Sequence, residues 1–129
     1  MIHIRQGKIE DFNDLKKDWA WGSSELLKEY IRKIEAGDRE FFVVEDEGKV
    51  IGEIHIFWVS DDREEANGVD RAYVSTLRID PRYRGQKLGT KLMERVFGRI
   101  EEKGFREATI GAYTAEVRTQ VWYHKLVFV

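Results

Sequence analysis

The residues whose types most directly suggest chemistry form one short segment, residues 80–90. It contains Gly85 and Gly89, and the cations Arg84 and Lys87 lie beside them. Glycine lets the backbone turn tightly and approach a ligand closely. A helix that begins in this segment would point its first N–H groups, and the positive end of its dipole, at whatever lies in front of it. Such a segment is suited to binding phosphate groups.

The flanking segments have the patterns of a strand and a helix. Residues 73–79 form an apolar, strand-like run, and Pro81 ends it because proline has no N–H to give to a strand ladder. After the loop, apolar residues recur at helical spacing, at Leu88, Leu92, Met93, Val96, Phe97 and Ile100. A strand, a glycine loop and a helix are the context that phosphate binding requires. A Walker-type phosphate loop is excluded, because Thr90-Lys91 reverses the required order and the glycines are too close.

A second candidate group for chemistry is a carboxylate and an imidazole on a predicted strand. Glu53 and His55 are two residues apart, so both side chains leave the same face of that strand. Either could take a proton from an amine, directly or through water, and histidine ordinarily titrates near neutral pH. The alternative is that both are half-solvated residues of an antiparallel strand. No spacing of His and carboxylates in the chain suits a metal site, so no metal is expected.

Residues 84–89, Arg-Gly-Gln-Lys-Leu-Gly, resemble the pyrophosphate-binding motif of GNAT-type N-acetyltransferases, Arg/Gln-x-x-Gly-x-Gly/Ala. Lys87 stands where the family usually has its first paired glycine, and its ammonium could help neutralise a phosphate. The resemblance implies acetyl-coenzyme A as cosubstrate and direct transfer of its acetyl group to a primary amine, without a covalent enzyme intermediate. The cofactor-binding residues that it implies are Leu77, Ile79, Arg84, Gly85, Gln86, Lys87, Leu88, Gly89 and Thr90.

The resemblance also implies catalytic roles. A backbone N–H near Ile79 would polarise the acetyl carbonyl, as main-chain donors do where negative charge develops. Tyr123 matches the family's tyrosine in the last helix, which protonates the departing thiolate; the alternative is a core aromatic with its hydroxyl at the surface. Tyr73 stands where many members have a strand glutamate, so Glu53 and His55 are the candidates for the base. Glu116 replaces an asparagine that contacts coenzyme A, which puts that contact in doubt.

The element order expected from the sequence is that of the GNAT fold, an α/β (mixed α+β) fold over residues 1–129 as a single domain. The expected sheet is mixed and mostly antiparallel, with helices on both faces. The strands are predicted at residues 2–5, 41–45, 50–59, 71–79 and 106–112. The helices are predicted at residues 10–19, from Ser23 or Ser24 to Gly37, and at 87–103 and 115–126.

The C-terminal end departs from the family pattern. The family usually closes with Tyr-x-x-x-Gly-Phe and two more strands, but here Val127 replaces the glycine and the chain is expected to lack those strands. The strand at residues 106–112 would then have an unpaired edge, which is a liability. Two explanations stay open: a second subunit covers the edge as a homodimer, or the chain is a truncated or altered version of a longer protein.

Composition excludes several classes of protein. The chain of 129 residues is 42% hydrophobic, so it can bury a core and is not disordered. Its net charge of −2 argues against a general nucleic-acid binder. It has no cysteine, and it has neither an apolar signal core nor a run of membrane-spanning length. We therefore expect a soluble cytoplasmic protein with no membrane or nucleic-acid partner.

The acceptor site is expected to lie between the early helices and the loop at residues 61–68. Trp19 and Trp21 flank a helix break, and the loop carries Asp61, Asp62, Glu64 and Glu65. Aromatic faces beside carboxylates would suit the cationic amine of a small molecule or a peptide. The alternative is that the loop is only solvated and Trp19 only part of the core.

Two other functions remain open on the sequence. One is a coenzyme-A-binding module without turnover, which the altered C-terminal end, Glu116 and the missing strand glutamate favour. The other is a small domain that binds phosphate polymers or nucleic acid through Arg82, Tyr83, Arg84, Lys87 and Lys91. The last predicts binding that is steeply salt-dependent and has no preference for coenzyme A.

Overall fold

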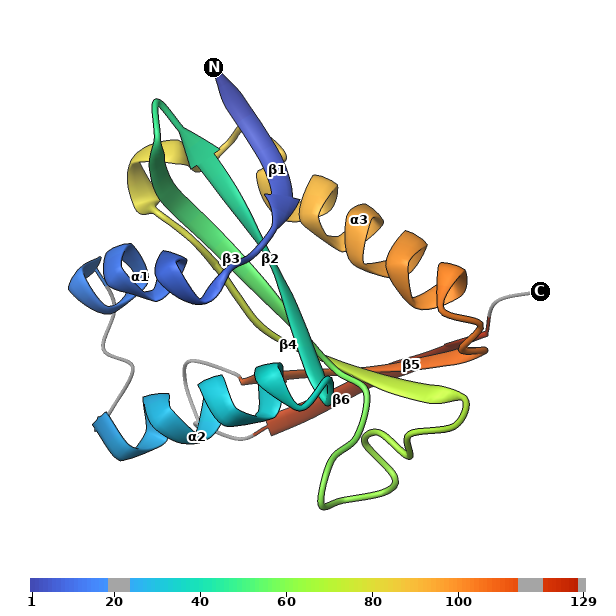
Figure 1. The fold of residues 1–129 in the computed structure, drawn as a ribbon. Coiled ribbons are helices and arrows are strands. Elements are labelled where there is room, and N and C mark those ends of the chain that lie inside the picture. Colours follow the sequence, from blue (N-terminus) through green and yellow to red (C-terminus); the bar gives the residue numbers. More distant parts are fainter. Residues whose placement is uncertain (19–23, 114–119, 128–129) are drawn as a thin grey trace.

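A single mixed sheet organises the structure, a computed structural model that describes residues 1–18, 24–113 and 120–127. Within those residues the sheet has six strands in the order β1-β2-β3-β4-β5-β6 (Figure 1). The strands are β1 (Ile2–Gln6), β2 (Arg39–Asp46), β3 (Lys49–Phe57), β4 (Arg71–Ile79), β5 (Glu107–Tyr113) and β6 (Gln120–Val127). Among the described strands, β4 and β5 alone are parallel. The predicted mixed, mostly antiparallel sheet is therefore confirmed.

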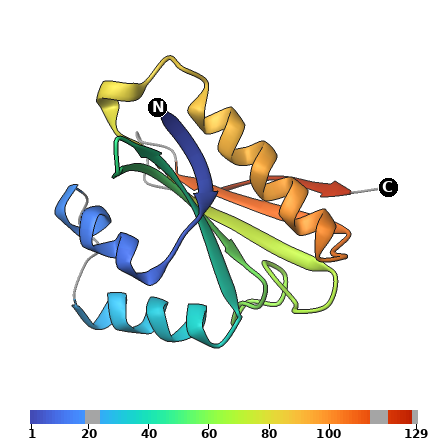
Figure 2. The same ribbon diagram turned by 45° about the horizontal axis from the view of Figure 1, so that its top comes forward.

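Helices cover both faces of the sheet, as predicted. They are α1 (Phe12–Asp18), α2 (Ser24–Glu35) and α3 (Leu88–Glu102), with 3-10 turns η1 (Ile9–Asp11) and η2 (Pro81–Tyr83). Because side chains alternate along a strand, Phe41 of β2 packs in the core with α1 and α2, and Phe42 packs in the core with α3. Figures 1 and 2 show α1 and α2 on one side of the sheet and α3 on the other.

A tight hairpin joins β2 and β3, between the strands predicted at residues 41–45 and 50–59. Its two turn residues, Glu47 and Gly48, have φ values of 50° and 81°. Positive φ at both turn residues matches the right-handed twist of the flanking strands, and it is the usual geometry of a two-residue hairpin.

The predicted helix at residues 115–126 is wrong, because residues 120–127 form strand β6 instead. β6 pairs antiparallel with β5, from Glu107 opposite Val127 to Tyr113 opposite Gln120. The β5 edge that was expected to be unpaired is thus covered by the same chain. The segment is rich in β-branched and aromatic residues, and a short apolar run of this kind fits a helical or a strand pattern equally well until a partner strand is present.

The strand β4 is irregular at its centre and departs from β5. Its register against β3 shifts between Glu53 and His55, and Thr76 there has a φ of 58°. β4 pairs with β5 only as far as Val74 opposite Ile110, although β4 continues to Ile79. Figure 1 shows β5 and β6 turning away from the other strands. As far as the described residues go, the second half of β4 therefore has an open edge on the side of β5.

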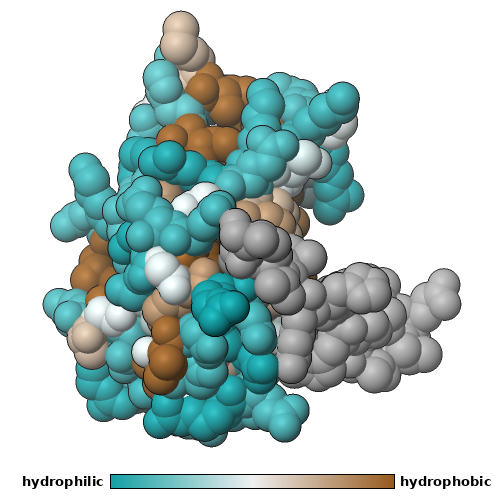
Figure 3. All heavy atoms as spheres, turned by 90° about the vertical axis from the view of Figure 1, so that its right-hand side faces the viewer, coloured by the Kyte–Doolittle hydropathy of each residue, from teal (hydrophilic) through white to brown (hydrophobic). Residues whose placement is uncertain are grey.

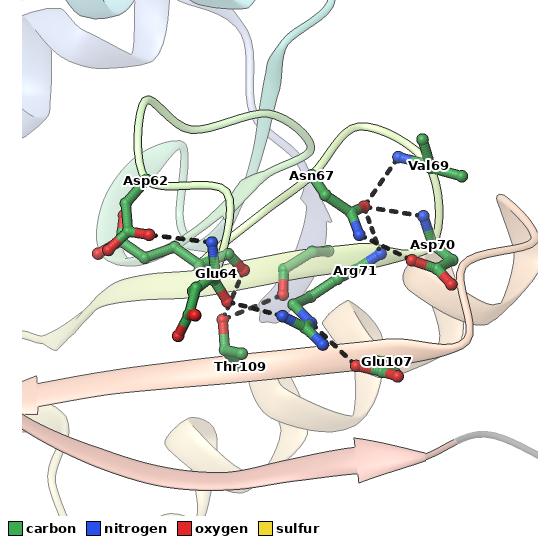
Figure 4. Close-up of polar contacts among 10 residues, drawn as sticks. Asp62, Glu64, Asn67, Val69, Asp70, Arg71, Glu107 and Thr109 are labelled. Carbon is green, nitrogen blue, oxygen red and sulfur yellow. Dashed lines mark hydrogen bonds and ion pairs between the residues drawn. The ribbon is translucent and has the colours of Figure 1, made fainter.

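The loop between β3 and β4 is held by hydrogen bonds (Figure 4), while its Asp61, Asp62 and Glu64 are exposed to solvent, as the alternative of a solvated acidic loop expects. The Asn67 side chain accepts hydrogen bonds from the amides of Val69, Asp70 and Arg71 at 2.9–3.0 Å. Thr109 on β5 donates to the Glu65 carbonyl at 2.7 Å, and so ties the loop to the sheet. Side-chain oxygens that accept amides in this way hold a turn in one conformation.

The surface is largely polar, as expected for a chain in which 36% of the residues are charged. The face in Figure 3 is mostly hydrophilic, with smaller apolar areas between the polar ones. Among the described residues, none of the helices is both long and apolar enough to cross a bilayer.

Candidate functional site

Two adjoining pockets lie where the open edge of β4 meets the glycine loop. One of about 480 Å³ is lined by Leu77, Arg78, Ile79, Pro81 and Arg84. The other, of about 210 Å³, is lined by Ile79, Tyr83, Arg84, Gly85, Lys87, Leu88, Gly89 and Thr90. Ile79 and Arg84 belong to both, so the two form one continuous cleft. Eight of the nine predicted cofactor-binding residues line it; Gln86 does not.

The main chain of β4 presents polar groups to this cleft. The amide of Asp80 donates to the Ile51 carbonyl on β3 at 2.8 Å. Because the backbone groups of successive strand residues point to opposite edges, those of Ile79 and Leu77 face away from β3, toward the open edge. The Leu77 side chain is 47% exposed beside them, which is unusual for a large apolar residue on a central strand. The arrangement suits an elongated ligand with both amide and apolar parts.

The start of α3 is suited to an anion. Lys87 is the N-cap residue with a φ of 59°, and its side chain gives the helix no capping hydrogen bond. Gly85 has a φ of 84°, a conformation that glycine adopts at little cost. The first amides of α3 therefore point outward beside the exposed Arg84 and Lys87, neither of which pairs with a carboxylate among the described residues. A helix N-terminus with two unpaired cations attracts phosphate.

An ion pair supports the turn between β4 and α3. Asp80 is buried and accepts hydrogen bonds from the Arg82 amide at 3.0 Å, from Arg82 Nε at 3.1 Å and from Arg82 Nη2 at 2.6 Å. These bonds stabilise the carboxylate and lower the pKa of Asp80 to about 2. Arg82 is thereby committed to the turn rather than to a ligand.

A second contact holds the turn from the opposite side. The Tyr83 hydroxyl donates to Asp46 Oδ2 at 2.7 Å, and the N-terminal amine lies 3.3 Å from Asp46 Oδ1. The hydrogen bond raises the pKa of Tyr83 and lowers that of Asp46. The β2–β3 hairpin therefore supports the loop that lines the cleft.

Glu53 and His55 lie together on β3, and their predicted common face is confirmed. His55 Nε2 and Glu53 Oε1 are 2.6 Å apart, and both side chains are 0% exposed. The expectation that they are half-solvated is wrong, because α1 and α2 cover that face of the sheet. Among the described residues Glu53 Oε2 has no hydrogen-bond partner. In this conformation neither side chain can touch a substrate directly.

Aromatic rings enclose the imidazole of His55. Phe41 stacks on it with 5.0 Å between ring centroids, and Tyr30 of α2 meets it edge-on at 5.7 Å. The Tyr30 side chain is half-buried and is hydrogen-bonded to Thr76 in the irregular part of β4. Sequence reasoning missed Tyr30, which the pattern assigns only to an apolar stripe, and Thr76, whose left-handed backbone has no sequence signal.

The other predicted site residues are not brought into this group by the described structure. The backbone of Tyr123 lies on β6 opposite Ile110, not on the helix that the resemblance implied, and its side chain lies outside the described part. Trp19, Trp21 and Glu116 also lie outside the described residues. In the part of the chain that the structure describes, no three His, Asp or Glu side chains gather as metal ligands would.

Comparison with solved structures gives one fold repeatedly. An N-acetyltransferase from Staphylococcus aureus Mu50 has a TM-score of 0.71 at 17% identity, over 91% of this chain and 76% of the other. The PaiA N-acetyltransferase of Thermoplasma acidophilum, in complex with coenzyme A, has 0.64 at 20% identity, over 91% and 82%. A predicted acetyltransferase of Clostridium acetobutylicum with acetyl-CoA has 0.65 at 13%, over 87% and 81%.

These identities are low enough that the structural comparison shows the fold alone. No curated protein matches the chain. The family model described as the acetyltransferase (GNAT) family, however, matches residues 8–127, which is nearly the whole sequence. That span includes the open edge of β4, the glycine loop and the start of α3, so the chain belongs to the GNAT acetyltransferase family.

Proposed function

We propose that this protein is an N-acetyltransferase that moves the acetyl group of acetyl-coenzyme A directly to a primary amine of a small molecule or a peptide. The observation that carries the proposal is the cleft, which joins main-chain groups on an open strand edge to a cationic helix N-terminus. Coenzyme A has the matching parts, an amide-containing arm and a pyrophosphate. Two proteins of the same fold are described with coenzyme A or acetyl-CoA.

Different residues of the cleft would bind different parts of acetyl-coenzyme A. The outward amides at the start of α3, with Arg84 and Lys87, would hold the pyrophosphate, and Gly85 and Gly89 would let it approach closely. The main-chain groups of Leu77 and Ile79 would bind the arm. An amide on this edge would also donate to the acetyl oxygen as negative charge develops there, where a preoriented donor contributes most.

The reaction also needs two proton transfers, one from the amine and one to the thiolate. The attacking amine must lose a proton, and the Glu53–His55 pair is a buried acid–base group on β3 opposite the irregular part of β4. The departing thiolate must gain a proton, and Tyr123 is the proposed donor. Tyr123 lies on β6 and not on a helix as in the family pattern. A Tyr123→Phe variant therefore tests its role as the proton donor.

Calorimetric titration with acetyl-coenzyme A, followed by acetylation of a panel of amines, tests the proposal. We expect binding at micromolar concentration and release of free thiol with at least one amine. A Lys87→Ala, Arg84→Ala double variant should bind less tightly, since two charges beside the pyrophosphate are removed. A folded protein that does not bind acetyl-coenzyme A would overturn the proposal.

A coenzyme-A-binding module without turnover is the second candidate. It is favoured by the complete burial of Glu53 and His55, and by the place of Tyr123 on a strand. This candidate gives the same calorimetric result but no acetylation of any amine, and Tyr123→Phe then changes nothing.

A further inference from the structure

Three side-chain hydroxyls form a row on the face of the sheet that α2 covers. Ser75 Oγ and Thr76 Oγ1 are 3.0 Å apart, and the Thr76 side chain is hydrogen-bonded to Tyr30. Ser75 is the direct partner of His55 in the register between β3 and β4. Side chains of directly opposed residues point to the same face, with Cβ atoms about 4.5–5.5 Å apart. The row therefore begins at the half-buried Tyr30 and ends beside the buried Glu53–His55 pair.

The backbone of Thr76 explains how two consecutive hydroxyls share a face. In a regular strand Ser75 and Thr76 would point to opposite sides of the sheet. A φ of 58° at Thr76 interrupts that alternation and places its hydroxyl beside that of Ser75. A β-branched residue in this conformation is a rare and costly exception, and strain of this kind is concentrated at functional positions.

We propose that, in the acetyl transfer proposed above, the hydroxyls of Tyr30, Thr76 and Ser75 pass the proton of the acceptor amine to the buried Glu53–His55 pair. This inference rests on the proposed function. Thr76 precedes Leu77, which lines the cleft, so the middle of the row lies on the strand along which acetyl-coenzyme A would lie. The relay also accounts for a buried acid–base pair that cannot touch the substrate itself.

The amine nitrogen forms a bond to the acetyl carbon, and the bond between that carbon and sulfur breaks, so that the thiolate leaves. The N–H proton passes to the first hydroxyl, and each hydroxyl gives its own proton to the next. In this conformation Ser75 is hydrogen-bonded to Thr76 and not to the pair, so its hydroxyl must turn toward His55 before the last transfer. With Nε2–H donated to Glu53, the proton is then taken up at Nδ1 of His55, and the charge of the imidazolium is offset by the Glu53 carboxylate. The pair later returns the proton to solvent along the same row.

The charged groups around the row are compatible with this role. Burial raises the pKa of Tyr30; Arg39 on β2 and the hydrogen bond with Thr76 act against burial, Glu53 acts with it, and Arg78 on β4 acts against it. Tyr30 therefore stays protonated at neutral pH, and its neutral hydroxyl can accept one proton and pass on another. Among the described residues, His55 contacts Glu53 on its own strand, Tyr30 from α2, and the uncharged rings of Phe12 and Phe41.

The experiment compares Tyr30→Phe and Thr76→Val with a matched control, Thr109→Val. The control removes a sheet hydroxyl that donates to the Glu65 carbonyl, outside the row. We expect kcat to fall about 100-fold in both row variants, with loss of the pH dependence and of the solvent deuterium isotope effect. Calorimetric affinity for acetyl-coenzyme A should be unchanged. The control should lose stability but keep the pH profile and the isotope effect of the unchanged protein.

A measurement without turnover tests the relay independently of the proposed function. In ¹⁵N-histidine NMR spectra of the protein alone, the buried His55 ring should exchange its proton with water faster in the unchanged protein than in either row variant. Equal exchange rates in all proteins would overturn the relay, as would an active enzyme whose pH profile and isotope effect survive both substitutions. Failure to bind acetyl-coenzyme A, by contrast, would overturn the proposed function and leave the exchange result to decide the relay.

Discussion

At the scale of single residues, Gly85 links backbone conformation to the proposed binding of acetyl-coenzyme A. Its φ is 84°, and a Cβ added there would meet no atom within 4 Å. Gly85→Ala therefore introduces backbone strain without a steric clash, which costs on the order of 1 kcal/mol. We expect weaker binding of acetyl-coenzyme A, measured by calorimetry, because the loop relaxes away from the conformation that places its amides.

Gly98 supplies the control for that substitution. It lies within α3, and a Cβ there also meets nothing within 4 Å, but its backbone is helical. Gly98→Ala should raise the free energy of unfolding by about 0.5–1 kcal/mol and leave the affinity for acetyl-coenzyme A unchanged. If both alanine variants bind alike, the conformation of Gly85 does not matter to the site.

The Asp80–Arg82 pair gives a pH dependence with a definite sign. The folded protein holds the pKa of Asp80 at about 2, below its ordinary value of 3.8. The unfolded chain thus binds more protons between those values, so stability is lost as the pH falls from about 4 toward 2. In Asp80→Asn this loss should be smaller, so urea midpoints measured across the acid range should vary less with pH. Equal slopes for the two proteins would contradict the assignment.

The position of a site residue could be predicted where it depends only on neighbouring residues in the sequence. Glycine and cations at fixed spacing identify the loop, and two-residue spacing placed Glu53 and His55 on one face. Their burial was not predictable, because it depends on where α1 and α2 pack. Thr76 and Tyr30 were not predictable either, because a bulge and the contact of a helix across it arise only when the strands pair.

At the scale of elements, β6 offers a direct test of strand against helix. Among the described strands β6 is the last of the sheet, so only one of its two edges is paired there. Backbone amides alternate between edges along a strand. Amide hydrogen exchange over residues 120–127 should therefore show slow and fast positions in alternation. Consecutive slow positions would instead indicate the helix expected from the sequence.

The error at β6 has a physical origin that the other elements lack. α3 has a full helical stripe of Leu88, Leu92, Val96 and Ile100, all buried, and the glycine loop before it marks its start. Residues 115–126 have only a partial stripe, and the choice of strand depends on β5 as a partner. The sequence pattern alone predicts whether a long periodic segment is a helix, whereas a short apolar segment becomes a strand or a helix according to its partners in the fold.

The contact between β3 and β4 gives a second prediction at this scale. A Cβ at Gly52 would lie 2.8 Å from Ile79 Cδ1 and 3.1 Å from the Arg78 carbonyl oxygen. Gly52→Ala must therefore displace β4 where it lines the cleft, at a cost of about 1–3 kcal/mol. Chemical denaturation should show that loss, and calorimetry should show weaker acetyl-coenzyme A binding. Unchanged affinity in a destabilised variant would mean that β4 does not align the ligand.

At the scale of the whole molecule, the cleft depends on segments that are distant in sequence. The Tyr83 hydroxyl reaches Asp46 on the β2–β3 hairpin, and the amide of Asp80 reaches Ile51 on β3. β4 and β5 pair only in their first halves, so in the described part of the chain the second half of β4 lacks one neighbouring strand. A ligand in the cleft would supply hydrogen bonds that the sheet itself leaves unmade there.

Acetyl-coenzyme A should for that reason stabilise the whole fold. A ligand that binds only the folded chain, present at one hundred times its Kd, adds about 2.7 kcal/mol, which raises the Tm of a protein of this size by on the order of 10 °C. Inorganic pyrophosphate reaches only the α3 end of the cleft and should raise Tm less. A single-stranded oligonucleotide should have no effect at moderate salt. If the oligonucleotide raised Tm as much as acetyl-coenzyme A, and added salt abolished both effects, the cleft would be a general polyanion site.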